Sequence, residues 1–225
     1  MEKLPGIRAC VFDAYGTLFD VRGPVARLAT DIGPHAEDIS RLWRQKQLEY
    51  SWLRSLMGVH ADFWHVTGDA LDYALDQYGV SEPGLRDELM ALYLKLDAYP
   101  EVAEALAAVK ARSKLTAILS NGSPSMLDAA VRHAGLDSLF NMVLSVEDVG
   151  IYKPSRRVYR HAMQKLQIHE APAICFISSN TWDTAGAAQF GFQVVRVDRF
   201  GLKDDRIPGK PAAVVKDLSG LAALL

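Results

Sequence analysis

The chain has 225 residues, of which 49% are hydrophobic and 23% are charged, and its formal net charge is -2. This composition predicts a globular protein with a sizeable core, as one domain or as one domain with a large insertion. Acidic and basic residues are intermixed, so we expect a small-molecule substrate and no nucleic acid. The first residues lack the pattern of a signal peptide, and no apolar run approaches the ~20 residues of a membrane span. We therefore expect a cytoplasmic protein that makes no use of a membrane.

The first predicted element is a buried strand over residues 7–12, because this run is short, apolar and closed by polar residues and glycine. Residues 24–97 show helical patterns and no convincing strand. Glycine and proline break these patterns at residues 31–38, 57–62 and 78–84.

One predicted helix, residues 38–57, is long and apolar around much of its surface. One apolar stripe consists of Ile39, Trp43, Tyr50, Leu53 and Met57, and a second consists of Leu48, Trp52 and Leu56. Such a helix is expected to pack on two sides.

From residue 100 onward, predicted helices and strands alternate. The helices are 100–111, 123–135, 155–166, 182–191 and 218–225, and the strands are 116–121, 142–148, 173–178, 193–198 and 213–215. This alternation predicts an α/β fold with a doubly wound parallel sheet covered on both faces. The helical insertion follows its first strand. We expect a core of residues 1–19 and 99–225 and a helical cap of residues 20–98.

Ligands of such sheets bind at the carboxyl ends of the strands. The residues expected there are Asp13, Ser120 with Asn121, and the segments 147–153 and 178–183. Because the insertion begins beside Asp13, it could close over this crevice as a lid. Cys10 and Cys175 lie inside apolar strands and are expected to be packing thiols.

Four short motifs resemble, in order, those of the haloacid dehalogenase superfamily. They are DAYGTLFD, LSNGS, YKPSRRVY and SSNTWD, and each lies at a predicted strand end or helix entrance. With LWRQKQLEYSWLRSLM in the insertion, the chain is similar to the L-2-haloacid dehalogenases over essentially its whole length. The resemblance implies a Rossmann-like core with a helical cap, and a homodimer.

Position 15 distinguishes two activities within that superfamily. Its phosphatases carry Asp-x-Asp in the first motif and hold Mg²⁺ with further acids of the fourth motif, because hard cations prefer carboxylate oxygens. Here Tyr15 replaces the second acid, and the fourth motif keeps one acid, Asp183. Halide leaves as an anion and needs no proton. We therefore expect hydrolysis of short L-2-haloalkanoic acids to 2-hydroxy acids, with no metal or cofactor. A Mg²⁺-dependent phosphatase is the alternative.

The resemblance implies the following roles. Asp13 displaces halide and forms an ester, inverting the carbon, and Asp183 with Lys153 nearby activates the water that hydrolyses it. Arg44 and Asn180 accept the halide, and Ser120 with the adjacent backbone binds the substrate carboxylate. The remaining implied site residues are Thr17, Tyr159 and Ser178 around the nucleophile, Asn121 beside Ser120, and Tyr15, Gln45, Leu48, Phe63 and Trp182 around the substrate side chain.

Plainer interpretations exist for these residues. Asp13, Ser120, Asn121 and Asp183 could cap turns or helices, Lys153 could be solvated, and the aromatic residues could be core. A non-catalytic binding protein would be expected to have lost one or more of Asp13, Lys153 and Asp183, and all three are present. The sequence leaves the preferred halogen and chain length open.

Overall fold

Six parallel strands form the sheet at the centre of the core, in the order β3-β2-β1-β4-β5-β6. The structure is a computed structural model that describes residues 3–203 and 205–225. The strands are β1 (Ala9–Phe12), β2 (Leu115–Ser120), β3 (Met142–Ser145), β4 (Ile174–Ser178), β5 (Gln193–Val197) and β6 (Ala213–Val215). β1 and β4 are central and wholly buried, as their continuous apolar runs require. The predicted doubly wound parallel sheet is confirmed.

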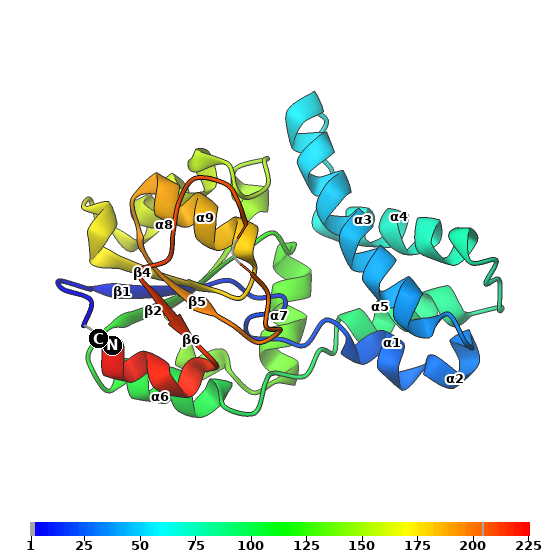
Figure 1. Ribbon diagram of the computed structural model, residues 1–225, viewed down its shortest axis with the longest axis horizontal. Helices are drawn as coiled ribbons and strands as arrows, with labels where there is room; N and C mark the ends of the chain where they lie inside the picture. Colours follow the sequence, from blue (N-terminus) through cyan, green and yellow to red (C-terminus); the bar gives the residue numbers. More distant parts are fainter. Residues whose placement is uncertain (1–2, 204) are drawn as a thin grey trace.

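Four helices cover this sheet, and Figure 1 shows α8 and α9 on one side with α6 on the other. They are α6 (Val102–Lys110), α7 (Pro124–His133), α8 (Arg156–Leu166) and α9 (Thr181–Phe190). The strand order explains this arrangement, because right-handed crossovers that move in opposite directions along a sheet place their helices on opposite faces. Successive strands are added toward one edge of the sheet from β1 to β3 and toward the other edge from β4 to β6. The connections after β1 and β4 therefore leave on opposite faces, and polar residues at the ends of these two strands face a common crevice.

The segment between β1 and α6 forms a helical lobe beside the sheet (Figure 1). It consists of α1 (Gly23–Arg27), α2 (Ala29–Ile32), α3 (Ala36–Met57), α4 (Phe63–Gln77) and α5 (Leu85–Tyr93). The predicted breaks are confirmed. α3 ends at Gly58, whose φ of 71° is the left-handed conformation that glycine adopts freely. α4 begins after Asp62, whose carboxylate accepts the backbone N–H groups of Trp64 and His65.

Two antiparallel stretches of chain join the lobe to the sheet. The backbone N–H of Asp20 donates to the carbonyl of Asp97 at 2.9 Å, and that of Tyr99 donates to Leu18 at 3.0 Å. The outgoing and returning connections are thus tied together directly after β1, next to Asp13.

Two predicted elements differ from the structure. The strand expected over 142–148 ends at Ser145, because the Ser145 hydroxyl accepts the backbone N–H of Glu147 at 3.2 Å and starts a 3-10 turn, Val146–Asp148. The helix expected at the carboxyl end is also of the 3-10 type, Leu218–Leu224.

The expected two-sided packing of α3 is wrong for its last turns. The buried residues of α3 are Ile39, Trp43, Gln47 and Ser51, so its buried face becomes polar half-way along. Leu56 is 85% exposed, and Leu53, Met57 and Val59 are exposed as well. This end of α3 projects beyond its neighbours (Figure 1), and the last residues of both apolar stripes, Leu53, Leu56 and Met57, are exposed.

Cys10 and Cys175 are paired neighbours on β1 and β4, and both are free and buried. The hydrogen bond with Cys10 and burial raise the pKa of Cys175 well above its usual value, which favours an unreactive thiol. Within residues 3–203 and 205–225, no helix has the length and apolarity to cross a bilayer.

Candidate active site

Asp13 lies at the carboxyl end of β1 and is 5% exposed. Its Oδ2 accepts hydrogen bonds from Thr17 Oγ1 at 3.0 Å, Ser178 Oγ at 3.2 Å and Asn180 Nδ2 at 2.6 Å. Its Oδ1 accepts from Lys153 Nζ at 2.8 Å. The two oxygens of one carboxylate therefore differ: Oδ2 is surrounded by neutral donors, while Oδ1 faces a single cation.

Lys153 joins Asp13 to a second buried carboxylate. Its Nζ donates to Asp183 Oδ2 at 2.5 Å and to the carbonyl of Leu119 at 3.0 Å. Tyr159 on α8 donates its hydroxyl to Asp183 Oδ1 at 2.7 Å. The Tyr159 hydroxyl thus contacts Asp183, which Lys153 links to Asp13.

Burial and charge act in opposite directions on this cluster. Burial alone would raise the pKa of Asp13, but the charge and hydrogen bond of Lys153, with Arg44 and Asn180, hold it below its usual value. Burial and the charge of Asp13 raise the pKa of Asp183 to about 6, although Lys153 and Tyr159 oppose this. Burial would lower the pKa of Lys153, but both carboxylates keep it raised. The cluster is one lysine cation shared by an ionised and a more basic carboxylate.

A glycine allows this contact between α8 and α9. A Cβ on Gly186 would lie 2.6 Å from Pro154 Cβ and 2.7 Å from the Tyr159 hydroxyl. Only a residue without a side chain lets α9 approach closely enough for Tyr159 to reach Asp183.

Arg44 brings a charge from the cap to this cluster. Its Nη2 lies 3.4 Å from Asn180 Oδ1 and 3.5 Å from the carbonyl of Tyr15, and its Nη1 donates to Gln47 Oε1 at 2.7 Å. Asn180 therefore contacts both Asp13 and Arg44. This arrangement places a guanidinium beside the carboxylate without a direct ion pair between them.

The Ser120–Gly122 turn lies at the end of the neighbouring strand, β2. Ser120 Oγ accepts the backbone N–H of Gly122 at 3.1 Å, and Asn121 Oδ1 accepts the backbone N–H of Lys153 at 3.0 Å. α7 starts two residues later at Pro124. Free backbone N–H groups at a helix start can stabilise an anion.

A cavity of about 480 Å³ opens between the cap and the core, and Asn180 in its lining connects it to Asp13, which is not part of the lining. Among its lining residues are Arg44, Gln45, Leu48, Asn180 and Trp182, all of them expected from the sequence. Its exposed surface is mainly apolar, although the lining includes four charged residues, Arg22, Glu37, Arg41 and Arg44, and several neutral polar ones. The cavity suits a small anion with an aliphatic side chain.

Tyr15 and Phe63 lie deeper than expected, outside the lining of that cavity. Phe63 packs between Tyr15 and Tyr152, with ring centroids 6.0 and 5.8 Å away. Tyr15 stacks on Tyr93 at 5.6 Å. Within the described part of the chain the buried Tyr15 hydroxyl has no hydrogen-bond partner, and a Cβ on Gly122 would lie 2.8 Å from it. Burial raises the pKa of Tyr15 well above its usual value, so this group is a poor acid for a leaving group.

Comparison with known proteins identifies the family of this chain. Residues 7–191 match the family model for haloacid dehalogenase-like hydrolases. An (S)-2-haloacid dehalogenase of Burkholderia cepacia is 49% identical over 87% of this chain and 84% of its own length. A second, from Pseudomonas sp. (strain CBS-3), is 46% identical over 97% of this chain and 96% of its own.

The chain belongs to the haloacid dehalogenase-like hydrolases. Within this family it groups with the L-2-haloacid dehalogenases. The solved structure of L-2-haloacid dehalogenase from Xanthobacter autotrophicus with chloropropionic acid covalently bound superposes with a TM-score of 0.90, at 39% identity, over 97% of this chain and 98% of that one. The resemblance that the motifs indicate is therefore confirmed.

The sequence assigns no role to two polar residues of this site, although Ser179 lies in the expected segment 178–183. Ser179 donates its backbone N–H to Thr17 Oγ1 at 2.8 Å and its hydroxyl to the carbonyl of Gly16 at 2.6 Å, which fixes the turn after Asp13. Its place inside SSNTWD was the available signal. Gln47 contacts Arg44 but lies among the apolar positions of α3, where the stripe pattern hides it.

The acids of this site converge on a cation that the chain itself supplies. Asp13 and Asp183 both bind Lys153, and Tyr15 contributes no carboxylate. Among the described residues, no three His, Cys, Asp or Glu side chains form a group suited to a metal ion. The donor set thus offers Mg²⁺ fewer carboxylates than a hard cation prefers.

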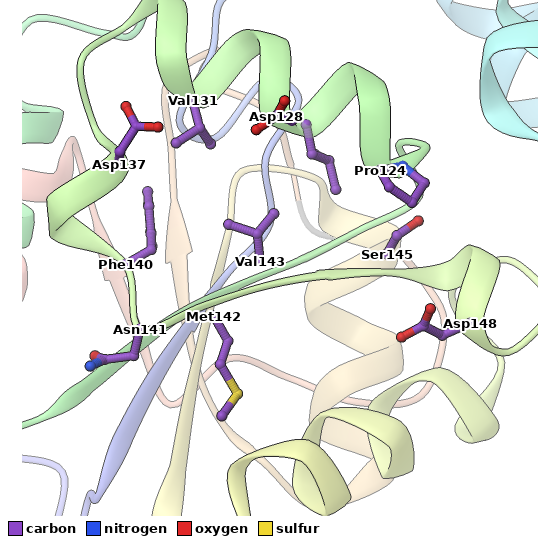
Figure 2. Close-up of a pocket in the computed structure, with 11 residues that line it drawn as sticks. Pro124, Asp128, Val131, Asp137, Phe140, Asn141, Met142, Val143, Ser145 and Asp148 are labelled. Atoms are coloured by element: carbon purple, nitrogen blue, oxygen red, sulfur yellow. The ribbon is translucent and has the colours of Figure 1, made fainter.

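A further cavity of about 370 Å³ lies on the outer edge of the sheet, against β3 and α7 (Figure 2). Its floor contains Phe140, Met142 and Val143, and Asp128, Asp137 and Asp148 stand around it. Asp128 pairs with Arg132, and Asp148 pairs with His161 and Lys165. Asp13, Lys153, Asp183 and Tyr159 are not among the residues that line this cavity.

Proposed function

We propose that the protein hydrolyses short L-2-haloalkanoic acids to 2-hydroxy acids, with inversion at C2, through an ester on Asp13 and without a metal ion. The observation that carries the proposal is the unequal hydrogen bonding of the Asp13 carboxylate, next to Arg44. Oδ1 faces only Lys153 and keeps a lone pair for attack, whereas Oδ2 accepts from Thr17, Ser178 and Asn180.

In the first step, Asp13 Oδ1 forms a bond to C2 while the carbon–halogen bond breaks. The bonding electrons leave with the halide, which Arg44 and Asn180 accept on the far side of C2. A delocalised guanidinium suits a large, weakly hydrated anion. The substrate carboxylate is bound by Ser120 and the N–H groups of the turn that contains Asn121, in front of α7.

In the second step, water attacks the ester carbon of Asp13. The carbonyl oxygen of that ester is Oδ2, so the donors of Thr17, Ser178 and Asn180 already surround the oxygen that becomes negative. Asp183 takes a proton from the water, the departing hydroxyl oxygen receives one, and one proton per turnover goes to solvent. Ester formation removes the charge of Asp13, which is one cause of the raised pKa of Asp183. Asp183 is therefore ionised when a base is needed.

The cavity lining supports an aliphatic substrate side chain. Leu48 and Trp182 line the cavity, and Gln45 lies at its exposed rim. Tyr15 and Phe63 contact each other and lie outside the lining of this cavity. We propose that residues 20–98 act as the cap domain of this site and that 1–19 with 99–225 form the catalytic core. The paired connections around Phe19 and Ala98 support this division.

The deciding experiment follows labelled oxygen in a single turnover. Excess enzyme is mixed with L-2-chloropropionate and EDTA in H₂¹⁸O, and the peptide that contains Asp13 is analysed by mass spectrometry. We expect chloride release, inverted lactate, and one ¹⁸O in the Asp13 carboxylate, because water attacks the enzyme carbon. D-2-chloropropionate is the control and should release no chloride. Label found only in the lactate would overturn the ester mechanism, and activity only on phosphate esters with Mg²⁺ would assign a phosphatase.

We further propose that the protein is a cytoplasmic homodimer and that the exposed end of α3 takes part in the contact. Leu53, Leu56, Met57 and Val59 are exposed on one projecting segment. A contiguous apolar surface of this kind favours association with a second copy. Leu56→Glu should give a monomer in sedimentation velocity. Ile207→Glu, at an apolar residue that is 50% exposed on another segment, should leave the wild-type mass unchanged.

A further inference from the structure

A buried amide in the cap lies behind the guanidinium of Arg44. Gln47 is 1% exposed and sits one helical turn after Trp43 on the buried face of α3. Its Oε1 accepts from Arg44 Nη1 at 2.7 Å, and its Nε2 donates to Thr67 Oγ1 at 2.7 Å. It also contacts the hydroxyl of Tyr93, at 3.1 Å from Nε2. Gln47 therefore connects Arg44 to α4 and α5, which pack beside α3 (Figure 1).

The surrounding hydrogen bonds fix the direction in which the amide points. Thr67 Oγ1 donates its only proton to the carbonyl of Phe63, at 2.6 Å, so it can only accept from Gln47. The NH₂ group must then face Thr67, and the carbonyl oxygen must face Arg44. This chain of donors runs from Arg44 through Gln47 and Thr67 to the backbone of α4. A leucine at position 47 would fill the same space but could not continue this chain of hydrogen bonds.

The contacts of Arg44 show why this direction matters. Its hydrogen bonds to Tyr15 and Asn180 on the core side are long, at 3.5 and 3.4 Å, whereas the bond to Gln47 is short, at 2.7 Å. The short bond to a rigid, buried acceptor fixes Nη1. Nη2 is thereby directed to the core side, beside Asn180 and above Asp13. A neutral acceptor leaves the full positive charge of Arg44 available, as a carboxylate would not.

We propose that Gln47 is a positioning residue of the halide-acceptor site: through Arg44 it sets the place at which the departing halide is stabilised. This inference rests on the proposed function, in which Arg44 accepts the halide. Gln47 itself does not touch the substrate. Its effect is confined to the step in which the carbon–halogen bond breaks, and it has no part in the hydrolysis of the ester.

The test compares leaving groups in single-turnover halide release. In Gln47→Leu, Arg44 loses its short hydrogen bond, so release of chloride from L-2-chloropropionate should slow about 10-fold. Bromide is a better leaving group and needs less stabilisation, so the bromide-to-chloride rate ratio should rise several-fold. Inhibition by added chloride should weaken by about 10-fold, since the same site binds the free ion. The rate at which the ester is hydrolysed should not change.

Ser51→Ala is the matched control, because Ser51 is a buried polar residue one turn further along the same face and bonds only within α3. It should keep the wild-type leaving-group ratio. Gln47→Glu keeps the acceptor but partly neutralises Arg44, so chloride inhibition should weaken in this variant too. If Gln47→Leu does not fold, Thr67→Val is the alternative, because it removes the hydroxyl that accepts the hydrogen bond of the Gln47 NH₂ group. This variant should also raise the bromide-to-chloride rate ratio.

The outcomes separate this inference from the proposed function. Wild-type enzyme that releases no halide would overturn the proposed function first. Wild-type activity together with a Gln47→Leu variant that slows chloride and bromide release equally, and keeps its chloride inhibition, would show a purely structural role for Gln47. The same result with Thr67→Val would overturn the inference where Gln47→Leu cannot be purified.

Discussion

The core and the cap hold their charged groups in different ways. Asp13, Lys153 and Asp183 are almost completely buried and contact one another at 2.5 to 2.8 Å. Arg44 in the cap is half-buried and reaches the core only through contacts of 3.4 and 3.5 Å. The core charges depend on one another for stability, whereas the cap charge is held by neutral groups. From this difference we infer that the core holds the proposed reacting carboxylates rigidly, whereas the cap supplies a less rigidly held acceptor, Arg44, for the departing halide.

The largest expected effect comes from removing Asp13, the proposed nucleophile in the core. Asp13→Asn should lower halide release by 10⁴-fold or more, on the order found when a covalent nucleophile is lost. The measurement is chloride released from L-2-chloropropionate, with mass spectrometry to verify that residue 13 is still asparagine. Wild-type rates from a verified variant would remove Asp13 from the mechanism.

The next largest effect is expected on stability, where removing a core cation should cost more than removing the cap cation. Lys153→Met leaves two buried carboxylates without their cation and should lower the free energy of unfolding by about 3–5 kcal/mol. Arg44→Met removes two long contacts to the core and one short hydrogen bond to the neutral Gln47, and should lower it by only about 1 kcal/mol. Urea unfolding of both variants at neutral pH tests the comparison. Equal losses would mean that the cap charge is as structural as the core charge.

The pH dependence of ester hydrolysis tests the base within the core. Asp183 must be ionised to accept a proton, so the rate should fall as pH drops through its pKa. That pKa is about 6 in the free protein, and it is lower in the ester form because Asp13 is then uncharged. The Tyr159 hydrogen bond lowers the pKa of Asp183, so Tyr159→Phe should move the acid limb to higher pH. Rapid-quench measurement of the rate of hydroxy-acid formation at a series of pH values gives the acid limb of this profile, which is the pH range in which the rate falls.

Tyr152→Phe is the control for that shift. Tyr152 is also a buried tyrosine, but its hydroxyl donates to the carbonyl of Ala61 in the cap, whereas the Tyr159 hydroxyl donates to Asp183. Its acid limb should coincide with that of the wild type. A limb that moves equally in both variants would indicate a general loosening of the site.

The smallest effect is expected where the two regions touch at the surface. Glu147 of the core accepts from His60 at 2.8 Å and from the backbone N–H of Phe63 at 3.2 Å, both in the cap. Glu147→Gln weakens this partly exposed contact and should raise KM by roughly 3- to 5-fold while kcat changes little. Initial rates over a range of L-2-chloropropionate concentrations test it. A fall in kcat with unchanged KM would show that the contact does more than hold the cap closed.

The sequence predicts the core better than the cap for a physical reason. Short, wholly apolar strands such as Ala9–Phe12 and Ile174–Ser178 have few alternative structures, and polar residues at their ends must meet at one edge of the sheet. The bonding of Asp13 to Lys153 and Asn180 depends on that topology. The catalytic roles of these residues were implied by the motifs and stay predictions.

The cap was less predictable because apolar spacing does not tell which face of a helix finds a partner. Leu56 belongs to an apolar stripe and is exposed, whereas Gln47 and Ser51 are polar and buried. The apolar spacing also does not predict which residues of other helices form hydrogen bonds with a buried amide such as that of Gln47. Thr67 and Tyr93, which bind Gln47, come from helices 20 and 46 residues further along the chain.

Gly186 has a practical consequence for anyone who engineers this enzyme. Replacement of glycine by alanine within a helix is a common route to a more heat-resistant protein, since alanine favours the helix by up to about 1 kcal/mol. At this position the added methyl group would push apart α8 and α9 and separate Tyr159 from Asp183. This overpacking costs about 1–3 kcal/mol, more than the helix gains, and the weakened contact between Tyr159 and Asp183 would slow ester hydrolysis at low pH.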